Sequence, residues 1–95
     1  MTLDIGALAE ICARNDIGRL RLFGSFARGD ATDRSDVDLI ADFTRRKSLL
    51  DLVRIEEEFA DRLGRKVDLL TEGSLSPYLR DRILGEARVV YERAA

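Results

Sequence analysis

The chain has 95 residues, of which 45% are apolar and 36% charged, and its 16 basic and 18 acidic residues leave a net charge of −2. This composition predicts one packed domain, residues 1–95, and a nearly neutral chain does not suit stable binding to a nucleic-acid backbone. Histidine is absent and Cys12 is the only cysteine, which excludes a His-containing catalytic triad, an internal disulfide and a cysteine-based zinc site.

Apolar spacing and turn residues in the first half of the chain predict one helix and two strands. A helix over about 3–14, with Thr2 as a candidate cap, leads to a strand at 19–23. Small and polar residues, including two glycines, occupy 24–35. The next segment, 36–43, alternates cleanly between apolar and polar residues, which predicts a second strand.

The second half begins with the strongest helix signal in the sequence. The segment 48–63 has Ser48 as a candidate N-cap, Asp51 in the position of a weak capping box and Gly64 as a candidate C-cap. Its apolar stripe consists of Leu49, Leu52, Val53, Phe59, Ala60 and Leu63. The remaining predicted elements are a strand at 66–71, a helix at 76–84 that begins at Pro77 and ends at Gly85, and an edge strand at 88–92.

This alternation of strands and helices predicts an α/β (α+β) domain, with helices packed on one face of a small mixed sheet. The residues expected in or near its core are Cys12, Phe23, Phe26, Phe43, Phe59 and Tyr91. A core of this size is modest, so an oligomer with itself or with another protein is an open alternative. No apolar run approaches the length of a transmembrane helix and the first residues lack a signal-peptide pattern, which predicts a cytoplasmic protein without membrane contact.

Three aspartates form the most unusual pattern. Asp36 and Asp38 are two residues apart in a strand, so their carboxylates share one face, about 6–7 Å apart along the backbone. Asp68 has the same parity in the next strand if Val67 and Leu69 point to the helices. The first two could simply face solvent, but three converging carboxylates need a compensating charge. A hard cation such as Mg²⁺ takes oxygen ligands of this kind.

A glycine-containing turn lies upstream of these aspartates. Gly24 and Ser25 directly follow a predicted strand, and Arg28 comes one turn later. Such a turn offers backbone N–H groups, a hydroxyl and a guanidinium to a phosphate group. An ordinary strand–helix turn is the alternative, and Arg28 could equally pair with Asp30 or Asp36.

The order of these residues resembles the signature of the nucleotidyltransferase superfamily that includes DNA polymerase β: Gly24-Ser25, ten residues, then Asp36-x-Asp38. The fuller string GSFARGDATDRSDVDLIADF is similar to the minimal nucleotidyltransferase (MNT) family, small prokaryotic proteins with little beyond the catalytic core. The likeness extends from about residue 19 to 92 and includes a third aspartate, Asp68. The resemblance therefore implies a nucleotidyltransferase-fold catalytic core.

The resemblance also implies a role for each motif residue. The nucleotide-binding set is Gly24, Ser25 and Arg28, and the metal-binding and catalytic set is Asp36, Asp38 and Asp68. In such enzymes the glycine-serine pair holds the triphosphate, and the third aspartate binds the second metal and helps to activate the attacking hydroxyl. Two Mg²⁺ ions and ATP as the substrate follow from this likeness.

Members of this family are often encoded with a HEPN-type RNase toxin and act as its antitoxin, by transferring AMP from ATP to a hydroxyl of the toxin, commonly a tyrosine. The resemblance therefore implies a protein adenylyltransferase whose partners are a HEPN-type toxin and ATP. One alternative is a non-catalytic antitoxin that neutralises its partner by occlusion. Its candidate partner surface is Leu75, Tyr78, Leu79 and Ile83, unless these residues pack on the core. Another alternative, a small-molecule nucleotidyltransferase, is disfavoured because such enzymes normally add an acceptor domain.

Overall fold

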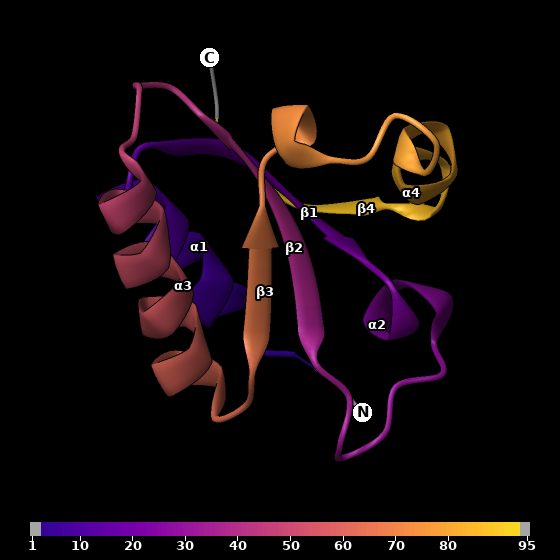
Figure 1. Ribbon diagram of the computed structural model, residues 1–95. Helices are drawn as coiled ribbons and strands as arrows, with labels where there is room; N and C mark the ends of the chain where they lie inside the picture. The colour runs from indigo at the N-terminus through magenta and orange to yellow at the C-terminus, as the bar shows by residue number, and fades with distance from the viewer. Residues whose placement is uncertain (1–2, 94–95) are drawn as a thin grey trace.

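A computed structural model of the chain describes residues 3–93, in which helices flank a four-stranded sheet (Figure 1). In chain order the elements are α1 (Ile5–Arg14), β1 (Ile17–Phe23), α2 (Ser25–Arg28), β2 (Val37–Phe43), α3 (Leu49–Leu63), β3 (Val67–Leu70), the 3₁₀-helix η1 (Glu72–Ser74), α4 (Arg80–Glu86) and β4 (Arg88–Glu92). The strand order is β3-β2-β1-β4; β2 and β3 are parallel, and the other pairs are antiparallel. The predicted small mixed sheet, with its last strand at an edge, is confirmed.

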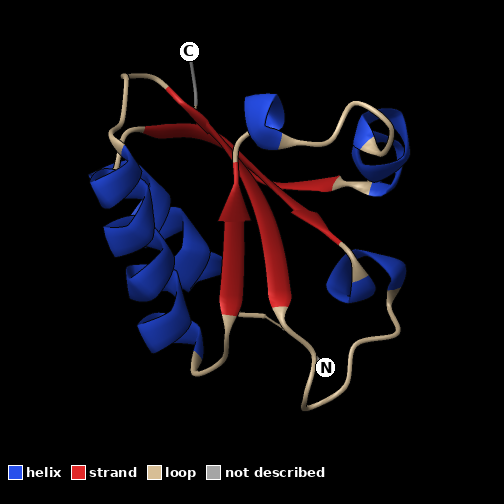
Figure 2. Ribbon diagram, viewed as in Figure 1, coloured by secondary structure: helices blue, strands red, loops and turns tan. Residues whose placement is uncertain are grey.

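The two long helices, α1 and α3, lie on one side of the sheet (Figure 2). The main core fills the space between them and the strands, and it consists of Leu8, Ile11, Cys12, Ile17, Leu20, Leu22, Ala27, Val37, Leu39, Ala41, Ile55, Phe59, Val67 and Leu69. Cys12 and Phe59 are fully buried, as predicted. Phe26, Phe43 and Tyr91 pack against the margin of this core. Between residues 3 and 93, no helix combines the length and the apolar content needed to span a membrane.

The opposite side of the sheet is also covered in part. The short elements η1 and α4 lie there, whereas α2 lies at the end of β1 and contributes Ala27 to the main core (Figure 1). Ile40 in β2 is fully buried but does not belong to the main core, and Leu75, which follows η1, is 8% exposed. The second face therefore has a small apolar patch of its own, at the level of η1. The polar residues of this face flank that patch.

Helix α3 has the predicted ends but packs through fewer of the predicted apolar residues. Ser48 and Asp51 form a capping box, and Gly64 ends the helix in the left-handed conformation. Ile55 and Phe59 are buried, whereas Leu49 is 79% exposed and Val53 is 44% exposed. The reason is geometric: at about 100° per residue, Val53 lies roughly 120° around the helix from Phe59.

Two other helix boundaries differ from the sequence-based expectation. Thr2 lies outside the described residues, and Asp4 caps α1, because its Oδ1 accepts a hydrogen bond of 3.1 Å from the Ala7 amide. The last helix, α4, begins at Arg80 and continues through Gly85 instead of ending there. The Ala87 amide still donates to the Ile83 carbonyl at 3.0 Å, and glycine lowers helix stability without preventing this bond.

Candidate active site

The glycine turn lies directly against Asp38. Gly24 follows the end of β1 with φ 71° and ψ −150°, a combination that is nearly restricted to glycine. A Cβ atom at this position would overlap the Oδ2 atom of Asp38. Ser25 then begins α2, whose single turn is closed by a 3.0 Å hydrogen bond from the Arg28 amide to the Gly24 carbonyl. Gly24 is therefore required both by its backbone conformation and by the close approach of a carboxylate.

Asp38 and Asp68 occupy paired positions on the parallel strands β2 and β3. Their neighbours Val37 and Val67 are buried in the main core, so the two aspartates are on the other face of the sheet. Burial raises the pKa of Asp38 to about 6, and repulsion from Asp68, a hydrogen bond with Asp68 and the charge of Asp36 add to this effect. The sheet thus holds two carboxylates next to each other without enough compensating positive charge.

Asp36 directly precedes β2. Its side chain is 42% exposed, and its Oδ2 lies 3.8 Å from the ammonium group of Lys66. Among residues 3–93, no group of three or more His, Cys, Asp or Glu side chains is close enough to enclose a metal ion. The uncompensated Asp38–Asp68 pair still fits Mg²⁺ chemically, because its donors are all carboxylate oxygens and a cation would relieve their repulsion.

A cleft of about 460 Å³ opens beside the glycine turn. It is lined by Phe23, Gly24, Ser25, Arg28, Asp36, Asp38, Leu79, Arg82, Ile83 and Glu86. Its volume lies in the range of small-molecule sites. Asp68 is not among these lining residues, and it lies next to Asp38 on the neighbouring strand. All three proposed nucleotide-binding residues and two of the three aspartates therefore meet at one cleft.

Sequence reasoning did not identify the wall of the cleft that comes from the end of the chain. Leu79 caps α4, and Arg82, Ile83 and Glu86 belong to it. No motif distinguishes these residues from those of an ordinary amphipathic helix. Phe23, expected in the core, also lines the cleft and is only partly buried, because it is the last residue of β1.

Arg28 is held at the rim of the cleft by two carboxylates. Its Nε lies 3.4 Å from Oδ2 of Asp30, which is one of the two pairings that the sequence left open. Its Nη1 also lies 3.2 Å from Oε1 of Glu86 in α4, a contact between residues 58 positions apart. The side chain is 50% exposed, so these pairs position the guanidinium more than they stabilise the fold.

The loop between the glycine turn and β2 is fastened by Arg65. This arginine donates hydrogen bonds to the carbonyl oxygens of Thr32 and Ser35, at 3.2 and 3.0 Å. Its guanidinium also lies 5.1 Å from the centre of the Phe26 ring, within the range of a cation–π contact. Arg65 thereby fixes the segment that connects Ser25 to Asp36.

Comparison with known proteins bears on this arrangement. The family profile described as "Polymerase beta, Nucleotidyltransferase" matches residues 7–95. MJ0435 of Methanocaldococcus jannaschii, by name a candidate protein adenylyltransferase, is 46% identical over 80 residues, which cover 84% of this chain and 86% of that protein. Protein adenylyltransferase MntA of Thermococcus cleftensis is 38% identical over 82 residues, covering 86% of this chain and 81% of that protein.

Solved structures show the same fold. A candidate minimal nucleotidyltransferase that is 40% identical superposes with a TM-score of 0.76, over 88% of this chain and 86% of that one. A toxin–antitoxin structure with AMP-PNP, 20% identical, has a TM-score of 0.83 over 95% of this chain and 74% of that one. A complex of an MNT antitoxin with the tri-AMPylated HEPN toxin of Shewanella oneidensis, 17% identical, has a TM-score of 0.72 over 93% and 69%. At such low identity the last two likenesses concern the fold alone.

Proposed function

Because this chain belongs to the polymerase-beta nucleotidyltransferase family, we propose that it transfers AMP from ATP to a hydroxyl group of a partner HEPN-type toxin and so acts as its antitoxin. The acceptor proposed is a tyrosine hydroxyl. The observation that carries the proposal is the contact of the Gly24 turn with Asp38, beside Asp68, at a cleft large enough for a ligand. Relatives named as protein adenylyltransferases and the fold shared with an MNT antitoxin bound to an AMPylated toxin support it.

The residues of the cleft have distinct roles in this proposal. The turn at Gly24 and Ser25 accommodates the triphosphate, with Arg28 at its rim. Asp36, Asp38 and Asp68 would hold Mg²⁺, two ions in the full site, and the bound metal would offset phosphate charge and lower the pKa of the acceptor hydroxyl. A site of this composition would need no histidine for catalysis, and the chain contains none.

The transfer itself is a substitution at the α-phosphorus. The acceptor oxygen forms a bond to the α-phosphorus, the bond from this phosphorus to the bridging oxygen breaks, and pyrophosphate leaves with the electron pair. Asp68 accepts the proton of the acceptor hydroxyl. Its position beside Asp38, on the adjacent strand, brings this base next to the carboxylate that contacts the glycine turn.

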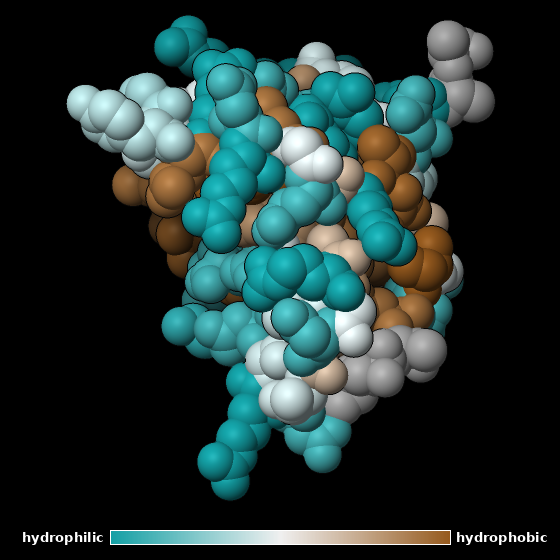
Figure 3. All heavy atoms as spheres, turned by 90° about the vertical axis from the view of Figure 1, so that its right-hand side faces the viewer, coloured by the Kyte–Doolittle hydropathy of each residue, from teal (hydrophilic) through white to brown (hydrophobic). Residues whose placement is uncertain are grey.

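Neutralisation by occlusion is a second candidate function, and exposed apolar side chains favour it. Tyr78 is 96% exposed and Leu79 is 48% exposed, whereas Leu75 is buried. The side of the molecule that carries α2 and α4 is largely hydrophilic, with hydrophobic atoms gathered towards its margins (Figure 3). A partner protein could therefore be bound by apolar contacts near the cleft whether or not AMP is transferred.

The two functions are separated by a labelling experiment. The purified protein is incubated with Mg²⁺, ATP labelled at the α-phosphate, and the HEPN-type protein encoded beside it. We expect label on that protein with the wild type and with Asp61→Asn, a matched change on the exposed surface of α3. Asp38→Asn and Asp68→Asn should abolish the label without preventing complex formation. Full neutralisation by these unlabelled complexes would instead support occlusion, and label on an added small molecule with none on the HEPN-type protein would contradict AMP transfer to that protein.

A further inference from the structure

Helix α4 forms one side of the cleft although its own packing is weak. It has seven residues, none of them buried, yet it contributes Arg82, Ile83 and Glu86 to the lining. A helix this short is unstable by itself, and apolar burial is what normally holds such a helix to a domain. Ile83 and Leu84 are partly buried, and this limited packing makes the other interactions that hold α4 over the cleft important.

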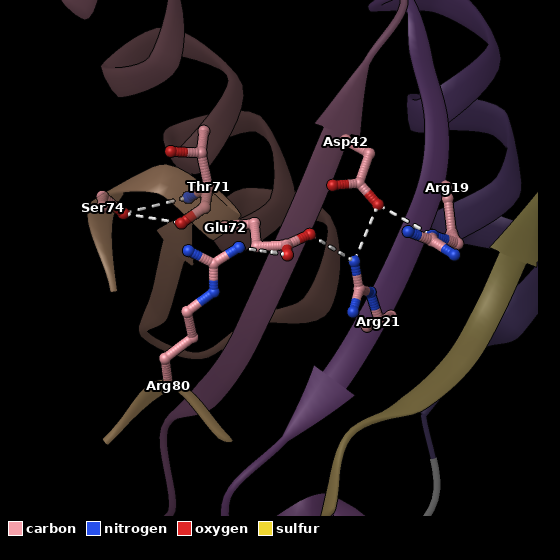
Figure 4. Close-up of polar contacts among 7 residues, drawn as sticks. All are labelled: Arg19, Arg21, Asp42, Thr71, Glu72, Ser74 and Arg80. Atoms are coloured by element: carbon pink, nitrogen blue, oxygen red, sulfur yellow. Dashed lines mark hydrogen bonds and ion pairs between the residues drawn. The ribbon is translucent and has the colours of Figure 1, made fainter. Parts of the chain in front are cut away.

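Ion pairs are present at both ends of α4, and the one at its start reaches a nearly buried residue of the sheet. At the first residue, Arg80 Nη2 lies 2.7 Å from Oε1 of Glu72. The other oxygen of Glu72, Oε2, accepts a hydrogen bond of 3.1 Å from Arg21 in β1 (Figure 4). At the last residue, Glu86 pairs with Arg28, as described above. Among residues 3–93, Glu72 is thus the carboxylate that connects Arg80, at the start of α4, to Arg21 of the sheet.

Arg21 makes this connection firm because it is nearly buried. Its side chain is 12% exposed, and its Nη2 also donates to Asp42 on β2 at 3.0 Å. Asp42 in turn accepts a hydrogen bond of 2.7 Å from Arg19 (Figure 4). The hydrogen bond from Arg80 and, to a lesser extent, the one from Arg21 hold the pKa of Glu72 below its usual range, so this carboxylate stays charged at neutral pH. The network therefore runs from the sheet to α4 without interruption.

We propose that Glu72 is a positioning residue of the nucleotide site: by joining Arg21 to Arg80 it fixes the start of α4, and with it the wall of the cleft that Leu79, Arg82 and Ile83 form. The inference rests on the proposed function for the identity of the ligand, but the attachment of α4 does not depend on it. Glu72 is not among the residues that line the cleft, so we expect it to act on nucleotide binding and not on the chemical step.

Hydrogen exchange of the backbone amides at 80–86 tests the attachment without any nucleotide. Glu72→Gln and Arg80→Gln should each accelerate exchange in this segment. The two changes together should add little to either one, because each breaks the same connection. Asp42→Asn is the matched control: it removes two ion pairs of the same network, those to Arg19 and Arg21, without removing a contact of α4. Unchanged exchange in Glu72→Gln, or equal acceleration in Asp42→Asn, would overturn the proposal.

Kinetics tests the consequence for the nucleotide. For Glu72→Gln we expect KM for ATP, and Kd for a non-hydrolysable ATP analogue with Mg²⁺, to rise roughly fivefold while kcat stays within about twofold, since the wall contacts ground state and transition state alike. Asp42→Asn should change neither constant. A fall in kcat with KM unchanged would refute the positioning role. If the wild type neither binds the analogue nor transfers AMP, the proposed function fails. The hydrogen-exchange result then tests only whether Glu72 holds α4 to the sheet.

Discussion

Replacing Gly24 with alanine tests the core of the site, because two penalties of different kind meet at this residue. With φ 71° and ψ −150°, the backbone occupies a region that is almost restricted to glycine, and an alanine there costs about 1–3 kcal/mol of folding free energy. The added Cβ would also overlap Oδ2 of Asp38. That oxygen is at the end of a side chain, so the overlap is relieved by moving the carboxylate rather than by unfolding.

Gly64→Ala and Gly29→Ala are controls with strain alone. Gly64 has φ 68° and Gly29 has φ 84°, and a Cβ at either position meets no described atom within 4 Å. Both lie in the left-handed region, where alanine costs about 1–2 kcal/mol. Urea unfolding should therefore show a loss of stability in all three variants, with the largest loss in Gly24→Ala.

AMP transfer should separate the variants much more strongly than stability does. We expect activity to fall by about a hundredfold or more in Gly24→Ala, because a displacement of about 1 Å at a catalytic group can have an effect of this size. Gly64→Ala should keep nearly full activity at a temperature where it is folded. If Gly24→Ala were as active as Gly64→Ala, the close approach of the turn to Asp38 would have no catalytic meaning.

Three further predictions follow from individual side chains. Because the pKa of Asp38 is raised from 3.8 to about 6, its contribution favours folding below about pH 4 and is lost as the pH rises through 6. In the absence of metal, the free energy of unfolding of Asp38→Asn should therefore exceed that of the wild type by about 1–2 kcal/mol at about pH 7.5. The same excess in the free energy of unfolding at about pH 4 would contradict this assignment. Cys12 is fully buried and burial raises its pKa to about 12, so a thiol reagent should modify it only as fast as the protein unfolds; rapid labelling of the native protein would show otherwise. Ser48→Ala removes the capping box of α3 and should cost about 1 kcal/mol in urea unfolding, whereas Ser76→Ala, at an exposed position outside the helices and strands, serves as the comparison.

Local patterns were enough to predict most elements and part of the site. Alternation along 36–43 and 66–71 indicated which face each aspartate occupies, because the side-chain period of a strand is two and one face must be buried. The register of β2 and β3 agrees, with Asp38 paired to Asp68. Capping residues marked the ends of α3 in the same way. By contrast, the apolar stripe of α3 was predicted too wide, since periodicity does not say how far a sheet extends beneath a helix.

The sequence by itself determined the strand parity, the glycine turn and the candidate residues for holding phosphate or metal, because these depend on neighbours within a few positions. Only the tertiary structure decided which distant groups meet them. The parallel pairing of β3 with β2 sets Asp68 beside Asp38, and the return of the chain through η1 and α4 brings Glu86 to Arg28 and Glu72 to Arg21, across 58 and 51 positions. Such contacts depend on how whole elements pack together, and no local pattern records them.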